Sequence, residues 1–285
     1  MADARPSRLT GLGEVMDRYT VILSDIWGVL HNGLQAWQEA VDALQQARAD
    51  GKTVILISNA PRPSDPVIAQ LQGLGVPRSA FDAIITSGDV TRSLLEGRFK
   101  GASVSHIGPD KDKPLVDGLP VTFTADQRAE VCLCSGLNDD QTETPEDYRP
   151  RLQALVDRGV PMICANPDKV VELGNRLMYC AGALADLYEE MGGETIVLGK
   201  PHAPIYEAAL SLAGGPPVAE CLALGDSVRT DLRGAADQGI DCVFVTGGIH
   251  ASEFGPSLMP NAARVEAFLA EAPYPAIGWM HRLSW

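Results

Sequence analysis

Four polar residues of this sequence occupy positions from which side chains can act together on a ligand: Asp25, Ser58, Lys200 and Asp226. Each lies at or just beyond the carboxyl end of a short apolar run that is typical of a buried strand. Ligands bind outside the carboxyl ends of the strands in an open parallel sheet. Any one of the four alone would be an ordinary cap, turn or surface residue. Their occurrence together, in this order, indicates a functional site.

The chemistry that these side chains suit is phosphoryl transfer. Asp25 and Asp226, with Asp231 close by, would offer carboxylate oxygens to a hard cation, which suits Mg²⁺. A carboxylate can also attack a phosphoryl group and form a covalent intermediate. A lysine and a hydroxyl, here Lys200 and Ser58, can hold the transferring oxygens while a metal neutralises the developing charge. Without a cation nearby, the carboxylates would repel one another strongly.

The elements that must position these residues alternate between strands and helices. The apolar runs that read as strands are Tyr19–Ser24, Lys52–Ser58, Thr195–Leu198 and Cys221–Leu224. The stretches Trp37–Ala49 and Thr230–Gln238 have the apolar spacing of helices. Continuous β-branched strands separated by helices predict a parallel sheet that is buried on both faces, the doubly wound α/β arrangement.

The middle of the chain reads as a second α/β unit. Strand-like runs there are Ala102–Ile107, Pro120–Thr124, Glu130–Cys134 and Val160–Cys164, and helical spacing returns at Ala181–Met191. A length of 285 residues fits two domains, at about 100–200 residues per domain.

Composition and charge indicate which kinds of partner and which cellular compartment to expect for this chain. The chain has 23 basic and 37 acidic side chains, a net charge of −14, so we expect no nucleic-acid partner. Its apolar runs are far shorter than the ~20 residues that span a bilayer, and the first residues have no apolar signal core, so we expect no membrane association. The six cysteines form no C-x-x-C pair and read as buried residues of a cytoplasmic protein. A metal role for Cys132 and Cys134 is the alternative, and the missing ligand spacing disfavours it.

Four short motifs resemble the haloacid dehalogenase (HAD) superfamily, class IIA branch, which includes para-nitrophenylphosphatase-like and sugar-phosphate phosphatases. In chain order they are Ser24–Leu30, Ile57–Asn59, Gly199–Pro201 and Gly225–Asp231. The Gly-Lys-Pro form of the third motif and the tripeptide Asn166-Pro167-Asp168 resemble class IIA in particular. The segment Gly234–Gly247 also resembles the stretch that follows the fourth motif there, so the match covers nearly the whole chain.

This resemblance implies a fold and an activity. The fold is a doubly wound, Rossmann-like core, residues 1–87 and 194–285, with an inserted α/β cap domain of the C2 type, residues 88–193. The cap would close over the site and select the substrate. The implied activity is that of a Mg²⁺-dependent phosphoric monoester hydrolase that acts on a small phosphorylated metabolite.

The resemblance also implies a role for each motif residue. Asp25 would be the nucleophile that forms an aspartyl-phosphate, while Ser58 and Lys200 would bind the phosphoryl group. The backbone N–H of Asn59 would add a further donor to that group.

The remaining implied roles concern the metal and the substrate. Asp25, the backbone carbonyl of Trp27 and Asp226 would coordinate Mg²⁺, and Asp231 would hold the metal's water shell. Asn166 and Asp168 would face the core from the cap and contact substrate. The alternative for this pair, weighed equally, is a plain Asn-Pro-Asp turn.

Trp27 is where the sequence departs from the family's phosphatases, which carry there an Asp that protonates the leaving group and then activates water. An indole cannot exchange protons in this way at neutral pH, and such a group is worth about 10²–10⁴-fold in rate. In a first reading the chain is still a phosphatase, which needs a good leaving group such as an aryl or acyl phosphate, or a substitute acid. His31 and His202 are the candidates for that acid, although an ordinary loop histidine is the stronger interpretation of each.

Two other readings of Trp27 stay open. The protein would bind a phosphorylated metabolite and turn it over poorly or not at all. Alternatively, Asp25 would attack carbon, as in the dehalogenases of the superfamily, which carry an aromatic residue at this place. Dehalogenases work without a metal, and three carboxylates held together without a cation are costly, so we rank this reading last.

The segment Tyr274–Trp285 is too apolar for a loose tail, because it contains two tryptophans, a tyrosine, a methionine and a leucine. We expect it to pack on the core or on a second copy of the chain in a homo-oligomer. The sequence leaves these alternatives open.

Overall fold

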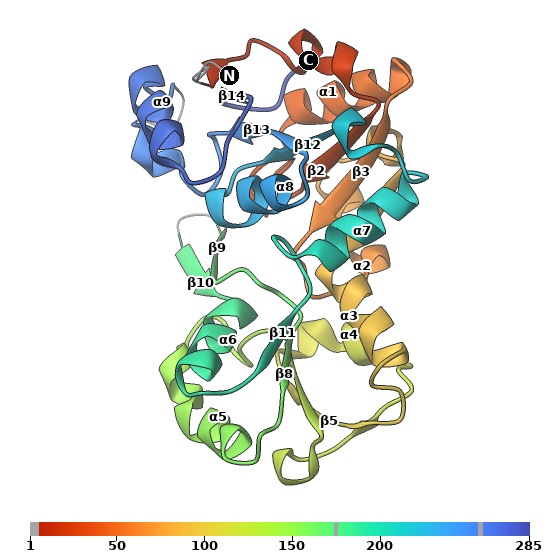
Figure 1. Ribbon diagram of the computed structural model, residues 1–285, viewed down its shortest axis with the longest axis vertical. Coiled ribbons are helices and arrows are strands. Elements are labelled where there is room, and N and C mark those ends of the chain that lie inside the picture. The colour runs from red at the N-terminus through yellow and green to blue at the C-terminus, as the bar shows by residue number, and fades with distance from the viewer. Residues whose placement is uncertain (1–5, 174–175, 256–258) are drawn as a thin grey trace. The chain divides into compact units, whose positions relative to one another are not determined.

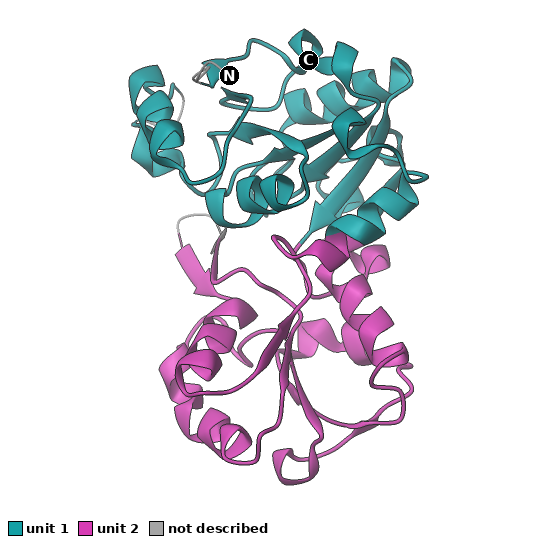
Figure 2. Ribbon diagram, viewed as in Figure 1, with its two compact units in different colours: residues 1–58, 68–84, 206–285 teal, residues 59–67, 85–205 magenta. Residues whose placement is uncertain are grey.

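The computed structural model describes residues 6–173, 176–255 and 259–285 (Figure 1). The chain forms two compact units, coloured separately in Figure 2. The first unit consists of residues 1–58, 68–84 and 206–285, and the second of residues 59–67 and 85–205. The predicted insertion, residues 88–193, lies wholly within the second unit, and its role as a cap stays a prediction.

A seven-stranded sheet forms the centre of the first unit. Its spatial order is β1 (Ser7–Arg8), β14 (Gly278–Met280), β13 (Asp241–Val245), β12 (Cys221–Gly225), β2 (Val21–Asp25), β3 (Thr53–Ser58) and β4 (Ala83–Thr86). The pairs from β1 to β3 are parallel. The chain proceeds from β2 outward to β3 and β4, and from β12 outward to β13 and β14. The winding direction therefore reverses between β2 and β12, and a reversal of this kind opens a crevice at the carboxyl ends of the two strands.

Helices and short turns surround this sheet. The helices that lie wholly or partly in the first unit are α1 (Gln38–Ala49), α2 (Ser64–Gly73), α7 (Ala203–Leu212), α8 (Arg233–Asp237) and α9 (Ala262–Glu271). The 3-10 turns are η1 (Leu12–Glu14), η2 (Met16–Arg18), η3 (Arg78–Ala80), η7 (Val218–Glu220) and η9 (Ala251–Phe254), and η8 (Val228–Leu232) is a π-helical turn. Helix α1 shows why such stretches are helical, because its buried residues all lie on one side: Ala40, Val41, Ala43, Leu44 and Ala47. Every residue of β2 is buried, as expected for a strand that is covered on both faces.

The second unit is built on a parallel sheet of its own. Its order is β11 (Thr195–Val197), β8 (Met162–Cys164), β7 (Val131–Cys134), β5 (Ser103–Ile107) and β6 (Thr122–Phe123). An antiparallel hairpin, β9 (Val170–Leu173) and β10 (Arg176–Tyr179), is separate from this sheet. The helices and turns of this unit are α3 (Ser87–Glu96), η4 (Asp110–Asp112), α4 (Lys113–Val116), η5 (Asp126–Arg128), η6 (Pro145–Tyr148), α5 (Arg149–Val156) and α6 (Ala181–Glu190).

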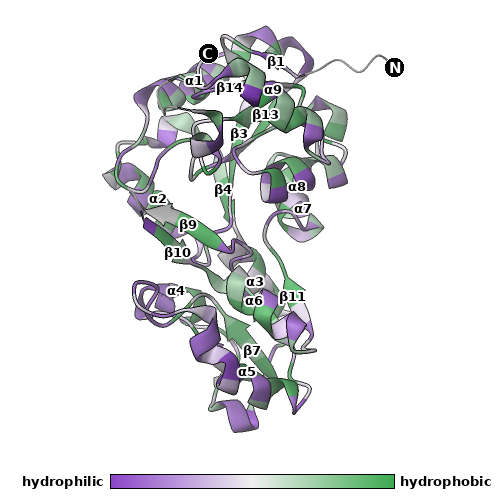
Figure 3. Cartoon of the chain, turned by 90° about the vertical axis from the view of Figure 1, so that its left-hand side faces the viewer, coloured by the Kyte–Doolittle hydropathy of each residue, from purple (hydrophilic) through white to green (hydrophobic). Residues whose placement is uncertain are grey.

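Strand β7 shows that the second sheet has a core on each face. Cys132 and Cys134 belong to one cluster of buried side chains, while Val131 and Leu133 belong to another. Successive side chains of a strand point to opposite faces, so alternate residues enter different clusters. The strand is correspondingly hydrophobic in Figure 3. The expected shared face of Cys132 and Cys134 is confirmed, and all six cysteines are buried, as the sequence predicted.

The predicted doubly wound α/β core is confirmed, with differences in detail. The expected helix Thr230–Gln238 begins as the π-helical turn η8, because the chain there must bring Asp231 back toward β12. The expected strand Pro120–Thr124 is only two residues long. The strands β1 and β14 were not predicted, since they have only two and three residues. The hairpin β9–β10, whose strands have four residues each, was also not predicted.

The segment after α9 packs on the first unit. Strand β14 lies between β13 and β1, and Trp279 is fully buried. Leu12 donates its backbone N–H to the carbonyl oxygen of Ser284 at 2.8 Å. The expectation that this segment is ordered against the core is therefore confirmed. Within the described residues, no helix is both long enough and apolar enough to cross a membrane.

Candidate active site

Strand register brings the predicted core residues of the site to one edge of the first sheet. Leu224 of β12 pairs with Ser24 of β2, and Asp25 of β2 pairs with Ile57 of β3. Asp25 therefore ends β2, Ser58 ends β3, and Asp226 follows β12 directly. This edge is the point where the winding direction reverses, so three polar side chains project from neighbouring strand ends.

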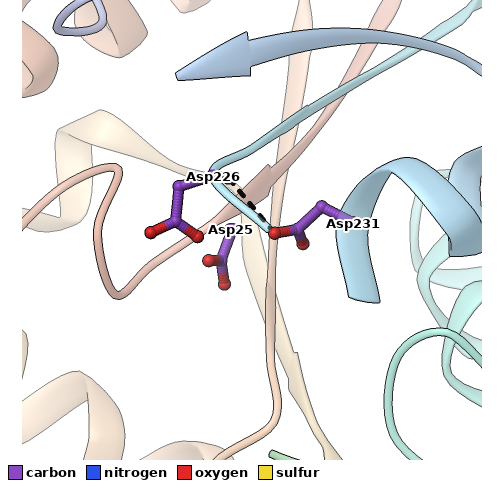
Figure 4. Close-up of side chains that lie close together, drawn as sticks. All are labelled: Asp25, Asp226 and Asp231. Atoms are coloured by element: carbon purple, nitrogen blue, oxygen red, sulfur yellow. Dashed lines mark hydrogen bonds between the residues drawn. The ribbon is translucent and has the colours of Figure 1, made fainter. Parts of the chain in front are cut away.

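The carboxylates of Asp25, Asp226 and Asp231 form one buried cluster (Figure 4). One oxygen from each lies within 4.8 Å of the others, and each residue is at most 9% exposed. Buried carboxylates at such distances repel one another and are stable only with compensating positive charge. An all-oxygen, all-carboxylate donor set suits a hard divalent cation such as Mg²⁺. The residues present therefore fit the metal that the sequence motifs imply.

Asp231 is positioned by the π-helical turn η8. Its Oδ2 accepts hydrogen bonds from the backbone N–H groups of Asp226 at 3.2 Å and Ser227 at 3.1 Å. A β-carbon at Gly225 would lie 2.2 Å from the Asp231 β-carbon, so only glycine fits at the end of β12. π-helical turns occur mostly as single insertions in helices, frequently at functional sites. Here the turn folds the Asp231 carboxylate back under the loop that carries Asp226.

Two backbone loops hold the carboxylate of Asp226. Ile249 donates its backbone N–H to Asp226 Oδ2 at 2.7 Å. β-carbons at Gly28 and Gly248 would lie 2.0 Å and 1.8 Å from the same oxygen. Gly28 also has a φ of +83°, a conformation that side chains disfavour. The two glycines thus let main chain approach the carboxylate closely from the loop after β2 and the loop after β13.

Trp27 is half-buried in the loop that follows Asp25. Its ring contacts that of His31 edge to face, with centroids 5.1 Å apart. Gly33 donates its N–H to His31 Nδ1 at 2.9 Å, and burial lowers the pKa of His31 to about 4. His31 is therefore neutral at pH 7, and its Nδ1 lone pair is already occupied. The alternative in which His31 replaces the missing acid is disfavoured by this geometry.

Asn59 organises the site residues of the second unit. Its Oδ1 accepts the backbone N–H of Lys200 at 2.7 Å, and its Nδ2 donates to the Lys200 carbonyl at 3.2 Å and to Asp168 Oδ1 at 2.9 Å. A β-carbon at Gly199 would lie 2.5 Å from Asn59 Oδ1, so the Gly-Lys-Pro motif packs directly on this side chain. Asn59 and Lys200 are both buried.

The Asn-Pro-Asp tripeptide is part of the same group. Asp168 donates its backbone N–H to Asn166 Oδ1 at 3.1 Å, which is the hydrogen bond of an Asx turn. The turn presents the Asp168 carboxylate to Asn59. The four predicted residues Asn59, Asn166, Asp168 and Lys200 are thus brought together, and the Lys200–Pro201 peptide bond is cis. The turn interpretation and the substrate-contact interpretation are compatible, and the second stays a prediction. His202, the other candidate acid, is exposed and donates its backbone N–H to the Gly199 carbonyl at 2.9 Å.

The sequence reasoning missed the loop after β13. Gly248 and Ile249 lie well beyond the fourth motif, yet they contact Asp226 through main-chain atoms. The available signal was the pair Gly247-Gly248 directly after a strand, since consecutive glycines often mark a close approach of backbone to a polar group.

Comparison with known proteins identifies the class of this α/β protein. Residues 22–121 match the model of a family described as haloacid dehalogenase-like hydrolase, and residues 197–271 match a second model described as HAD-hydrolase-like. A crystal structure of a hydrolase of the haloacid dehalogenase-like family from Brucella suis is 44% identical, covers 98% of this chain and 99% of its own, and superposes with a TM-score of 0.84. The chain therefore belongs to the haloacid dehalogenase-like hydrolase family.

Two curated relatives from Bacillus subtilis are more distant in sequence. The 5'-nucleotidase YutF is 25% identical over 84% of this chain and 91% of its own length. The sugar-phosphatase AraL is 27% identical over 80% of this chain and 83% of its own length. The similarity to both extends over at least four fifths of each protein.

Proposed function

We propose that this chain is a Mg²⁺-dependent phosphatase of the class IIA type that acts on a small phosphorylated metabolite. The observation that carries the proposal is the buried cluster of three carboxylates at the reversal point of the first sheet, with Ser58 on the next strand. The names of the relatives, a 5'-nucleotidase and a sugar-phosphatase, support phosphate monoesters as the substrate class.

In the proposed reaction, a carboxylate oxygen of Asp25 attacks phosphorus, and the bond from phosphorus to the leaving oxygen breaks. Water then attacks the aspartyl-phosphate and releases inorganic phosphate. Ser58, Lys200 and the N–H of Asn59 bind the phosphoryl oxygens through both steps. Asp25, Asp226 and the Trp27 carbonyl would hold the cation, with Asp231 behind them, and the bound cation supplies positive charge that offsets the charge on the phosphoryl group. Residues 88–193 act as the cap, from which Asn166 and Asp168 contact substrate.

The leaving group that this site favours is one of low pKa. Trp27 cannot protonate the departing oxygen, and His31 is neutral at pH 7 with its Nδ1 occupied. An aryl oxide or a carboxylate departs without protonation, whereas an alkoxide does not. Aryl and acyl phosphates are therefore the preferred substrates within the class.

Trp27 also favours a second candidate function, that of a phosphometabolite-binding protein with little or no turnover. The same cluster and the same phosphate-binding residues would serve binding alone. The two functions differ only in whether a proton carrier reaches the leaving group and the attacking water.

Phosphate release from para-nitrophenyl phosphate and acetyl phosphate, with and without Mg²⁺, separates the two functions. We expect release that depends on the metal and is lost in Asp25→Asn, which keeps the size of the side chain and removes the nucleophile. No release from either compound, with Mg²⁺ binding retained in calorimetry, would replace the phosphatase by the binding protein.

A further inference from the structure

The guanidinium of Arg282 lies between two loops of the first unit. Its Cζ is 3.7 Å from the centroid of the Trp37 ring, and its Nη1 donates to the carbonyl oxygen of Gly247 at 2.8 Å. Trp37 ends the loop that begins after Asp25, and Gly247 lies in the loop after β13. Arg282 itself follows β14, so one side chain from a third segment joins two loops that are far apart in sequence.

These are the same two loops that hold Asp226. In the first loop, Trp37 donates its N–H to Leu30 O at 2.9 Å, and Gly28 donates its N–H to His31 O at 2.8 Å. These bonds make the segment from Gly28 to Trp37 a closed loop, which carries the Gly28 backbone that packs on Asp226. In the second loop, Gly247 precedes the two residues whose main chain contacts the carboxylate, Gly248 and Ile249.

The fit around Arg282 is close. A β-carbon at Gly247 would lie 2.6 Å from the carbonyl oxygen of His281 and 2.9 Å from Arg282 Nη1, so glycine allows this loop to lie against the segment that carries Arg282. Burial lowers the pKa of Arg282, and the charge of Glu39 on the first turn of α1 opposes this. A guanidinium can stack on a ring through its face and donate through its edge at once, which a lysine ammonium cannot do.

We infer that Arg282 is a positioning residue for Asp226, and that by joining the two loops it sets the affinity of the carboxylate cluster for its cation. This inference rests on the proposed function, because that function makes the cluster a Mg²⁺ site. Arg282 would affect the cation indirectly, through the position of the Asp226 carboxylate. Residues that orient a metal ligand typically change metal affinity by about 10–100-fold when they are substituted.

The test compares Arg282→Ala and Arg282→Lys with Arg8→Ala, using the full chain. Arg8 is the matched control, because its Cζ lies 5.8 Å from the Trp279 ring centroid in the same kind of contact, on β1 and away from the carboxylates. Mg²⁺ dissociation constants are measured by titration calorimetry, and amide exchange of residues 246–250 by mass spectrometry. We expect Arg282→Ala to weaken Mg²⁺ binding by about tenfold or more and to speed exchange at Ile249, with Arg282→Lys nearly as weak and Arg8→Ala unchanged.

A purely structural role would lower the melting temperature and leave the Mg²⁺ constant and the Ile249 exchange rate as in the wild type, which would overturn the inference. If Arg282→Ala fails to fold, the pair Trp37→Phe and Trp37→Ala replaces it. The phenylalanine keeps a ring for the guanidinium and should bind Mg²⁺ as the wild type does, whereas the alanine should show the loss. Equal constants for this pair would also contradict the inference.

The proposed function and this inference fail separately. A wild type that binds Mg²⁺ more tightly than Arg282→Ala, but hydrolyses neither phosphate, supports the inference and contradicts the phosphatase. If the wild type hydrolyses both phosphates and Arg282→Ala has an unchanged Mg²⁺ dissociation constant, the phosphatase is supported and the inference about Arg282 is contradicted. A wild type that binds no Mg²⁺ overturns the inference.

Discussion

Two residues after Asp25 the chain carries an indole where the family resemblance implies a carboxylate. Trp27 packs against His31, and that histidine is buried, neutral at pH 7 and hydrogen-bonded through Nδ1. These contacts disfavour His31, the immediate neighbour of Trp27, as a replacement proton carrier. Under the proposed phosphatase function, the residue at this position would serve both half-reactions, so a substitution of Trp27 tests that function directly.

Trp27→Asp should speed the second step of the proposed reaction, in which water hydrolyses the aspartyl-phosphate on Asp25. In the wild type with acetyl phosphate and Mg²⁺, we expect Asp25 to be phosphorylated faster than water removes the group, so that intact-protein mass spectrometry shows an added phosphoryl mass during turnover. In Trp27→Asp the adduct should disappear, and hydrolysis of an alkyl phosphate should rise by about 10²-fold or more.

Trp27→Phe is the matched control, since it keeps an aromatic ring and adds no proton carrier. It should retain the adduct and show no gain on alkyl phosphates. A wild type that never carries the added mass, while releasing phosphate steadily, would contradict the slow second step.

His31 should make the first unit sensitive to acid. Its pKa is about 4 in the folded chain, against 6.5 for an unperturbed histidine. Between these pH values the unfolded chain binds more protons at His31 than the folded chain does, so the free energy of unfolding rises with pH. The contribution of His31 to that free energy is lost as the pH falls from 6.5 toward 4. At about 1.4 kcal/mol per pKa unit, the contribution is of the order of 3 kcal/mol.

Urea unfolding of the wild type and His31→Asn at pH 7.0 and 5.0 checks this. The variant should be less stable at pH 7.0, because it loses the buried ring, and its stability should change less between the two pH values. His106 in the second unit also has its pKa lowered to about 4 by burial. His106→Asn is therefore the control, and it should leave the pH dependence of the first unit as it is. Parallel pH dependence in the wild type and His31→Asn would show that His31 is not the titrating group.

At the scale of elements, the site is made by strand ends and by the turns that follow them. β2, β3 and β12 supply Asp25, Ser58 and Asp226 from adjacent positions. The backbone N–H groups of Asp226 and Ser227 then hold the Asp231 carboxylate, which η8 carries, and the N–H of Ile249 in the loop after β13 holds the Asp226 carboxylate. The elements contribute mainly main-chain contacts here, which explains why glycines cluster around the carboxylates.

Gly225→Ala should displace Asp231, because the added methyl group would lie 2.2 Å from the Asp231 β-carbon. Overpacking of this kind typically costs about 1–3 kcal/mol, and the lost N–H contacts should also weaken Mg²⁺ binding. Gly73→Ala is the control, since nothing lies within 4 Å of a β-carbon there. Thermal unfolding and calorimetry of both variants measure the two effects. Normal Mg²⁺ affinity in Gly225→Ala would mean that the site does not depend on the position of Asp231.

At the scale of the molecule, each of the two units has its own parallel sheet, and the first also gathers segments from both ends of the described chain. β1 and η1 lie against β14 and the residues that follow it. Trp279 is fully buried between these segments. The segment after α9 is therefore part of the first unit's core, and through Arg282 it also contacts the loops of the site.

Trp279→Ala should destabilise the first unit by about 3–5 kcal/mol, which is typical of large-to-small changes in a core. Trp285→Ala is the control, because Trp285 is 38% exposed and should cost much less. Urea unfolding followed by circular dichroism measures both. A similar loss in the two variants would show that the segment is held by its last residue rather than by the buried strand.

The sequence by itself determined which strands end at candidate site residues and the order of the four motifs. It also determined the alternation of strands and helices that is typical of a parallel sheet. These features are largely local, because a short apolar run of β-branched residues favours a buried strand, and a polar residue at the end of such a strand lies at an edge of the sheet. The types of residue also suggested the candidate chemistry, since three carboxylates, a lysine and a serine suit phosphoryl transfer with a divalent cation.

Only the tertiary structure decided which distant groups support those residues. The N–H of Ile249, the π-helical turn that carries Asp231 and the guanidinium of Arg282 act through main-chain atoms or through contacts between segments far apart in the chain. Such contacts depend on how loops pack, and they leave no periodic signal in the sequence. Burial likewise set the pKa of His31, because the cost of charging a histidine depends on the side chains that exclude water from it.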